Sequence, residues 1–252
     1  MKKFQFLLFY FSLFFAGNIS AQIIKKPVPK KVVTGKVTTR KSIVKKPVKS
    51  SVIKALPDNS IKIKIVTDSG TMIVKLYDST PLHRDNFVKL VKEGFYDSLM
   101  FHRIIQGFMI QGGDPNSKNA ASGVMLGNGG DNLTRIPAEF RKSLFHKKGV
   151  LAAARDGNPE KASSACQFYI VQGKPLSDAE LDMFEGRLGI KYSLEQRNIY
   201  KKIGGTPSLD QNYTVFGEVI SGLNVVDKIA SAPKAPSDRP IGDIRMKMEV
   251  VK

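Results

Sequence analysis

The stretch that most constrains the fold is Phe101–Pro115, in which two short apolar runs flank Gln106-Gly107. The runs are rich in Ile and Phe and end in Gly-Gly-Asp-Pro, a pattern typical of two strands joined by a tight turn. If the turn folds the strands together, Arg103 lies opposite Gln111. The sequence therefore predicts a β-hairpin that carries an arginine beside an amide.

Side chains alternate along a strand, so Phe101, Arg103 and Ile105 are expected on one face. The hairpin then brings Arg103 close to Phe108 and Met109, at the edge of an apolar dish. The alternative is structural, because strand arginines usually face solvent and Phe and Met usually fill a core. The pattern alone does not decide between a binding site and an ordinary strand.

The positive charge of the chain is concentrated near its N-terminus. The net charge is +18 over 252 residues, yet no acid precedes Asp58. Thirteen of the 40 Lys and Arg residues lie at or before Lys54, which leaves 27 bases against 22 acids in the remainder. The globular part is thus only mildly basic, which argues against a nucleic-acid-binding domain.

Residues 1–21 have the order of a secretory signal peptide. Lys2-Lys3 precede the apolar run Phe4–Phe15, and Ser20-Ala21 provides a small-residue exit. We expect cleavage after Ala21 and export to the periplasm, the cell envelope or the exterior. An uncleaved membrane anchor is the alternative.

Residues 22–57 form a segment rich in Lys, Val, Pro, Thr and Ser, without aromatic residues. Such a segment buries too little apolar surface to offset its ordering entropy, so we predict a disordered basic linker. A solvated tether is the favoured interpretation, and weak contact with anionic envelope surfaces is the alternative. The folded domain is expected over residues 58–252.

The domain reads as mainly β, with many short strands and a few helices between them. The pattern predicts a hairpin over residues 61–77, strands over 149–154, 167–172, 213–219 and 241–251, and helices over 81–94, 221–230 and, in two pieces, 177–205. Short strands at this spacing suggest a closed antiparallel barrel with helical caps.

Four blocks carry a resemblance to a known family. They are FHRIIQGFMIQGGDP from Phe101, GVLAAAR from Gly149, CQFYI from Cys166 and LDQNYTVFG from Leu209. In this order they resemble the cyclophilin family of peptidyl-prolyl cis-trans isomerases, over roughly residues 62–252. The resemblance implies a closed eight-stranded antiparallel β-barrel capped by two α-helices, here with a helical insertion over 177–205.

The same resemblance implies the site residues. Arg103 matches the catalytic arginine, and Gln111 matches the glutamine that orients it. The expected substrate-binding residues are Phe108, Met109, Ala154, Arg155, Gln167, Tyr169, Leu209 and Tyr213.

The chemistry of prolyl isomerisation suits an arginine beside an apolar dish. The peptide C–N bond resists rotation by roughly 18–20 kcal/mol, because nitrogen donates its lone pair into the carbonyl. At the twisted transition state the prolyl nitrogen becomes a hydrogen-bond acceptor. A guanidinium directed at that nitrogen binds the twisted state better than either planar isomer. No metal or cofactor is needed, and none is expected.

The sequence departs from the family pattern at the dish. Tyr169 replaces the usual phenylalanine, so its hydroxyl must find a partner. Ser208 stands where some members carry tryptophan, which weakens the expectation of cyclosporin-type binding. Arg155 occupies a position that is commonly asparagine.

Other chemistries find little support. His83, His102 and His146 are the only histidines, and none has metal-ligand spacing. The single cysteine, Cys166, cannot form an intramolecular disulfide and is expected to be a small buried residue.

The sequence thus predicts an exported peptidyl-prolyl isomerase that assists protein folding by acting on proline-containing polypeptides. A non-catalytic proline-peptide binding module, tethered by the basic arm, is the alternative. No heptad repeat or other dimer element is visible, so we expect a monomer without a specific nucleic-acid partner.

Overall fold

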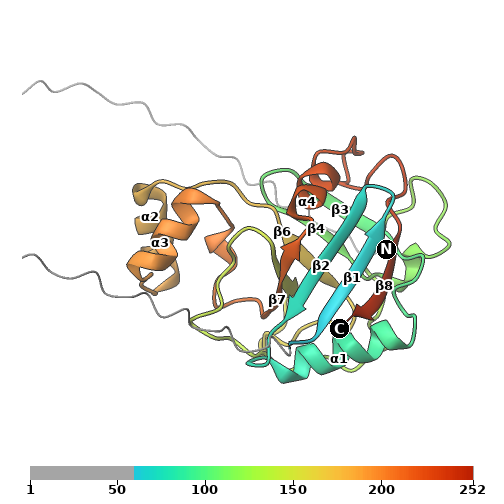
Figure 1. Ribbon diagram of the computed structural model, residues 1–252, viewed down its shortest axis with the longest axis horizontal. Helices are drawn as coiled ribbons and strands as arrows, with labels where there is room; N and C mark the ends of the chain where they lie inside the picture. Colours follow the sequence, from blue (N-terminus) through green and yellow to red (C-terminus); the bar gives the residue numbers. More distant parts are fainter. Residues whose placement is uncertain (1–59, 252) are drawn as a thin grey trace, which may run out of the picture. The chain divides into compact units, whose positions relative to one another are not determined.

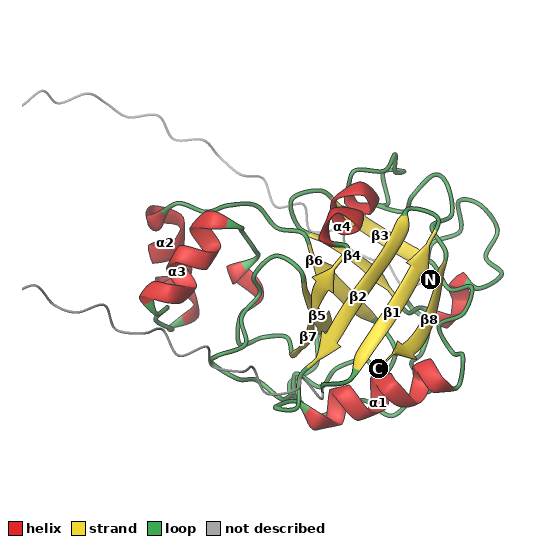
Figure 2. Cartoon of the chain, viewed as in Figure 1, coloured by secondary structure: helices red, strands yellow, loops and turns green. Residues whose placement is uncertain are grey.

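The computed structural model describes residues 60–251. The predicted signal peptide, 1–21, and basic linker, 22–57, lie outside the described residues. The described part contains an eight-stranded sheet in which every neighbouring pair is antiparallel (Figures 1 and 2). The expected mainly β fold is confirmed.

The strands lie in the order β3-β4-β6-β5-β7-β2-β1-β8. Their bounds are β1 Lys62–Thr67, β2 Gly70–Leu76, β3 Phe101–Ile105, β4 Met109–Gly112, β5 Val150–Ala153, β6 Phe168–Val171, β7 Val215–Ser221 and β8 Met246–Val251.

The sheet curls without closing into the barrel that we expected. Its edge strands, β3 and β8, do not pair along their lengths. The segments that begin them meet at the isolated bridge between Met100 and Arg245, with backbone bonds from Phe101 N to Ile244 O at 2.9 Å and from Met246 N to Leu99 O at 2.8 Å. The last strand begins at Met246 rather than at residue 241, because Gly242 and Asp243 are residue types depleted in strands. The fold is an open half-barrel of eight strands.

Two helices cover the ends of the curled sheet, as Figure 1 shows. Helix α1 (Pro81–Lys92) packs against β7 and β8, and α4 (Leu223–Ala230) packs against β2, β3 and β4. Each helix turns an apolar stripe toward the sheet, with Phe87 of α1 and Val226 of α4 buried.

The insertion forms two further helices, α2 (Asp178–Leu188) and α3 (Leu194–Lys202). Both begin with a capping box, from Ser177 and Ser193, as the sequence predicts. Two short 3₁₀ helices complete the fold, Pro115–Ser117 and Pro207–Leu209. No helix among residues 60–251 has the length and apolar character needed to cross a membrane.

Alternation along the strands divides the apolar residues between two clusters. One fills the interior of the curl and contains Ile104, Ile110 and Phe168. The other lies on the opposite face and contains Met109 and Tyr169. This second face carries the candidate site.

Phe101 does not share a face with Arg103, although simple alternation predicts that it does. A register shift between the two residues turns Phe101 into the interior cluster, where it is fully buried. A bulge of this kind moves every side chain before it to the other face, and the apolar pattern gives no sign of it.

Candidate functional site

A hollow of about 110 Å³ lies on the outer face of strands β3, β4 and β6. We call it the Arg103 hollow. Its lining residues are Arg103, Phe108, Met109, Gln111, Ala154, Arg155, Tyr169, Leu209 and Tyr213. The structure therefore brings together every predicted site residue except Gln167.

Strand register sets the centre of this hollow. Arg103 pairs with Gln111 across β3 and β4, and Gln111 pairs with Tyr169 across β4 and β6. Paired residues point to the same side of a sheet, so Arg103 and Gln111 of the hairpin and Tyr169 of β6 form one row. The turn between β3 and β4 requires a left-handed residue, and Gly107 supplies it with φ 76°.

The floor of the hollow is apolar and the rim is charged. Met109 is 2% exposed and Tyr169 is 5% exposed, whereas the Arg103 side chain is 44% exposed. Leu209, at the end of a 3₁₀ helix, and the half-buried Phe108 pack against this floor. An apolar ring could thus be enclosed while a polar group met Arg103 at the edge.

Gln111 makes no hydrogen bond to Arg103 in the described part of the chain. Its Nε2 instead donates to Gln167 Oε1 at 3.1 Å. Gln167 Nε2 in turn donates to the carbonyl oxygens of Gly127 and Gly129, both at 2.9 Å. The two amides are fixed by the 127–129 loop, and the orienting role of Gln111 stays a prediction.

Arg103 has a charged neighbour that the sequence analysis did not identify. Its Nε lies 3.7 Å from Asp238 Oδ2, which is an ion pair beyond hydrogen-bonding distance. Asp238 also pairs with Lys234 Nζ at 2.6 Å. Sequence gives no sign of this contact, because 135 positions separate Arg103 from Asp238.

Arg155 forms another part of the rim. Its guanidinium lies over the Tyr213 ring, 4.7 Å from the centroid, and its Nε donates to Asn212 O at 2.9 Å. Ala154 N donates to Gln167 O at 2.9 Å, so the backbone here extends the pairing of β5 with β6. Arg155 is thereby held flat along one wall of the hollow.

Gln167 lines a second hollow of about 140 Å³ instead of the first. Gln111, Ala154 and Arg155 line both, so the two hollows are adjacent. Gln167 therefore lies next to the Arg103 hollow, and its role in substrate binding stays a prediction. The side-chain oxygen of Gln167 accepts from Gln111, and its side-chain amino group donates to the backbone carbonyls of Gly127 and Gly129. These bonds hold Gln167 behind the row of Arg103, Gln111 and Tyr169.

The hydroxyl of Tyr169 has the partner that its burial requires. It lies 2.9 Å from His146 Nε2, and His146 Nδ1 lies 2.8 Å from Asp210 Oδ1. Burial, the largest cause, raises the pKa of Tyr169, so the phenol keeps its proton. The sequence analysis assigned no role to His146, because its contact with Tyr169 exists only in the fold.

A serine, a histidine and a glutamate also meet, beneath the start of α1. His83 Nε2 lies 3.0 Å from Ser163 Oγ and His83 Nδ1 lies 2.7 Å from Glu139 Oε2. This is the order of a nucleophilic triad, but all three side chains are buried and the adjoining hollow has only about 10 Å³. No substrate fits there, and Glu139 instead accepts from the α1 backbone at Leu82 and His83.

Within residues 60–251, no three His, Cys, Asp or Glu side chains lie close enough together to hold a metal ion.

Cys166 is free and buried, as expected, and burial raises the pKa of its thiol. A thiol with a raised pKa is a poor nucleophile. The chemical groups that line the Arg103 hollow are therefore the guanidinium groups of Arg103 and Arg155, the Gln111 amide and an apolar floor.

Comparison with known proteins gives a family match over most of the chain. The family described as cyclophilin type peptidyl-prolyl cis-trans isomerase/CLD matches residues 62–250. A relative from Staphylococcus epidermidis, named as a peptidyl-prolyl cis-trans isomerase, is 35% identical over 194 residues, which are 76% of this chain and 91% of that protein. One of the same name from Staphylococcus saprophyticus is 36% identical over 189 residues, covering 74% and 89%.

Solved structures agree on the fold. A crystal structure of a Cryptosporidium parvum cyclophilin type peptidyl-prolyl cis-trans isomerase matches with a TM-score of 0.55 and 24% identity, covering 77% of this chain and 98% of that one. A crystal structure of the same protein in the presence of the dipeptide Ala-Pro matches with a TM-score of 0.54.

Proposed function

Because the chain belongs to the cyclophilin-type peptidyl-prolyl cis-trans isomerase family, we propose that the Arg103 hollow is its active site and that Arg103 is the catalytic residue. One observation carries this proposal. The Arg103 guanidinium lines the same hollow as Phe108 and Met109, so a cation adjoins an apolar floor. The substrates are X-Pro bonds in proline-containing polypeptides.

The floor holds the proline ring while the preceding carbonyl turns. Met109 and Tyr169 are buried and rigid, and a ring seated on them is excluded from water. An X-Pro bond exchanges unaided in tens to hundreds of seconds. Lowering the rotation barrier by about 7 kcal/mol accelerates it on the order of 10⁵-fold.

Arg103 supplies the stabilisation that only the twisted bond can use. Among the described residues its guanidinium makes no hydrogen bond, and its only ion pair is the one with Asp238. Its N–H groups are therefore available to the prolyl nitrogen when conjugation breaks. The guanidinium stays charged at any physiological pH. Gln111 takes the orienting role once substrate excludes water from the rim.

The test is a proline-peptide isomerisation assay of the wild type, Arg103→Ala and Arg103→Lys. Loss of one preorganised donor lowers kcat by about 10²–10³-fold in enzymes of other classes, and we expect kcat/KM of Arg103→Ala to fall by a similar factor. Arg103→Lys should recover only part, because lysine lacks the planar fork.

Lys92→Ala is the matched control, because Lys92 is an exposed cation on α1. Its activity should equal that of the wild type. Equal, near-zero acceleration by the wild type and Arg103→Ala would instead favour the non-catalytic binding module tethered by a basic arm.

We further propose that the protein is exported and assists folding of other exported proteins. Support comes from the sequence of residues 1–21, with its basic start, apolar run and small-residue exit. N-terminal analysis of the protein recovered from its host should find Gln22 first. A chain that still begins at Met1 would contradict cleavage and favour the anchor.

A further inference from the structure

A chain of hydrogen bonds, half-buried at Tyr192 and buried from Tyr200 onward, leads from the α2–α3 insertion to the floor of the Arg103 hollow. We propose that Tyr192 and Tyr200 are positioning residues for the isomerisation, which act through Asp210 and His146 on the Tyr169 wall. The inference rests on the proposed function, since it assigns the insertion a part in shaping that active site.

Asp210 is the centre of this chain. Its Oδ2 accepts from the Tyr192 hydroxyl at 2.7 Å and from the Tyr200 hydroxyl at 2.6 Å. Its Oδ1 accepts from the backbone N–H of His146 at 2.7 Å and lies 2.8 Å from His146 Nδ1. A carboxylate has about four acceptor positions, and here all four are used.

His146 links Asp210 to Tyr169 through its two ring nitrogens. His146 Nδ1 completes the set of four contacts at the Asp210 carboxylate, and His146 Nε2 lies 2.9 Å from the Tyr169 hydroxyl. The Tyr169 hydroxyl therefore points away from the hollow, and Tyr169 presents only its ring to a proline.

Burial makes this chain stiff. The side chains of His146 and Asp210 are 1% exposed, and Tyr200 is fully buried. An unsatisfied polar group at such a depth is destabilising, so no member can turn without losing its partner. The ring of Tyr169 and the carboxylate of Asp210 are thus held in one relative position.

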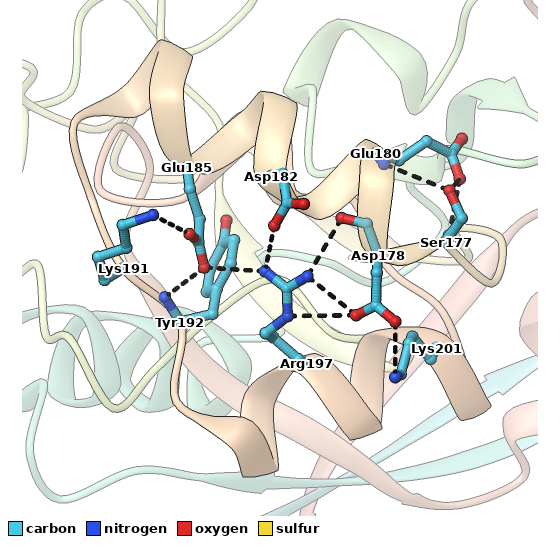
Figure 3. Close-up of polar contacts among 9 residues, drawn as sticks. All are labelled: Ser177, Asp178, Glu180, Asp182, Glu185, Lys191, Tyr192, Arg197 and Lys201. Atoms are coloured by element: carbon cyan, nitrogen blue, oxygen red, sulfur yellow. Dashed lines mark hydrogen bonds and ion pairs between the residues drawn. The ribbon is translucent and has the colours of Figure 1, made fainter. Parts of the chain in front are cut away.

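The insertion end of the chain is equally well fixed (Figure 3). Glu185 accepts from the backbone N–H of Tyr192 at 3.1 Å and pairs with Lys191 and Arg197. Arg197 of α3 also pairs with Asp178 of α2, so the two helices are clamped together. Tyr192, in the loop between the helices, is placed by this clamp.

At the other end the chain acts on two walls of the hollow. Tyr169 is held directly through its hydroxyl. Leu209 is held indirectly, because it directly precedes Asp210 in the sequence and Asp210 N donates to Pro207 O at 3.1 Å. Loss of the two insertion hydroxyls would free Asp210 to move and loosen both walls. Small misplacements of groups around a reacting bond reduce its rate.

The test uses tyrosine-to-phenylalanine changes, which remove a hydroxyl and keep the ring. The combined variant Tyr192→Phe/Tyr200→Phe touches no residue of the hollow. We expect its kcat/KM toward a proline peptide to fall about threefold to tenfold, with the peptide Kd changed by less than twofold. Tyr96→Phe is the matched control. The buried Tyr96 hydroxyl donates to Cys166 O at 3.2 Å and is not part of the hydrogen-bond chain from Tyr192 to Tyr169.

A double-mutant cycle separates positioning from general stabilisation. If the hydrogen bonds transmit the effect, adding Tyr192→Phe/Tyr200→Phe to Tyr169→Phe lowers kcat/KM by a smaller factor than it does in the wild type, because the link to Tyr169 is already absent and only the effect on Leu209 remains. Full additivity, or an effect no larger than that of Tyr96→Phe, overturns the proposal.

A readout without activity keeps this inference distinct from the proposed function. Coupling between two sites is reciprocal, so saturating proline peptide should shift the nuclear magnetic resonance signals of the His146 and Tyr192 rings. Shifts at both residues support coupling through the hydrogen bonds from Tyr192 to Tyr169, even if Arg103→Ala is as active as the wild type. No shift at Tyr192 overturns it.

Discussion

The hydroxyl of Tyr169 lies behind the floor of the Arg103 hollow, 2.9 Å from His146 Nε2. Replacing phenylalanine by tyrosine on an apolar wall usually adds a polar group that a proline ring would avoid. Here the added hydroxyl is bonded on the far side of the ring. The departure from the family pattern therefore leaves the wall apolar where substrate would contact it.

His102 gives a prediction on acid stability. It is buried, neither ring nitrogen has a partner among the described residues, and burial, the largest cause, lowers its pKa to about 4. The unfolded chain takes up a proton near pH 6.5 and the folded chain does not, so stability falls as pH drops from about 6.5 toward 4. Between pH 7 and pH 5 this histidine should remove about 2 kcal/mol from the free energy of unfolding.

Urea unfolding of the wild type and His102→Phe over this pH range measures that contribution. The variant should lose less stability than the wild type on acidification, by about the same 2 kcal/mol. Parallel curves for the two proteins would contradict this, because they would mean that the pKa of His102 is the same in the folded and the unfolded chain.

Most of the site was predictable from the sequence, because strand alternation and the motifs shared with the family are both local in the sequence. Arg103, Phe108, Met109 and Gln111 lie within one hairpin, whose register follows from its turn. The contact of Gln167 with the 127–129 loop was not predictable, and the Asp238 contact depends on the loop before β8. Such contacts are set by tertiary packing alone.

At the scale of the secondary elements, the two ends of the α2–α3 insertion lie close together. The chain enters it near Gly173 and leaves it at Gly204 and Gly205, where two backbone segments touch. A Cβ on Gly204 would lie 2.4 Å from the backbone carbon of Lys174, and its φ is +87°. Only glycine fits a left-handed position with backbone at that distance.

Gly204→Ala should therefore destabilise the protein by about 3 kcal/mol or more, from strain and from overlap with rigid backbone. Gly186→Ala is its control, because Gly186 lies within α2 with open space around it. That change should stabilise the protein by roughly 0.5–1 kcal/mol. Denaturant unfolding measures the free energy of unfolding of both variants. Equal changes would contradict the claim that the backbone packing at Gly204 admits only glycine.

The elements themselves were largely predictable, but their ends and closure were not. The capping boxes at Ser177 and Ser193 are local signals, and both helices begin where those signals lie. Helix α1 differs, because Thr80 makes no side-chain cap and Glu139, far along the chain, accepts from its first N–H groups. Barrel closure likewise depends on how β3 and β8 meet, which neither strand encodes alone.

Across the whole molecule, charge is divided between a basic N-terminal segment and a mildly basic remainder. Eleven of the 40 bases lie between Lys25 and Lys54. Deleting residues 22–56 should leave kcat/KM toward short proline peptides unchanged within about twofold, because the Arg103 hollow is built from later residues.

The same deletion tests the linker as a contact with anionic surfaces. The alternative, contact with anionic surfaces, predicts that the full chain binds anionic vesicles weakly, with an affinity that falls as salt rises, and that the shortened chain loses this binding. Absent or salt-insensitive binding by the full chain would leave the segment as a solvated tether.

The central claim is that Arg103 stabilises a half-rotated X-Pro bond. Exchange nuclear magnetic resonance of a bound proline peptide tests it most directly, because it measures the rotation rate on the protein separately from binding. For Arg103→Ala we predict a peptide affinity within a few-fold of the wild type and a rotation rate lower by about 10²–10³-fold. An unchanged rotation rate on the variant would contradict the claim.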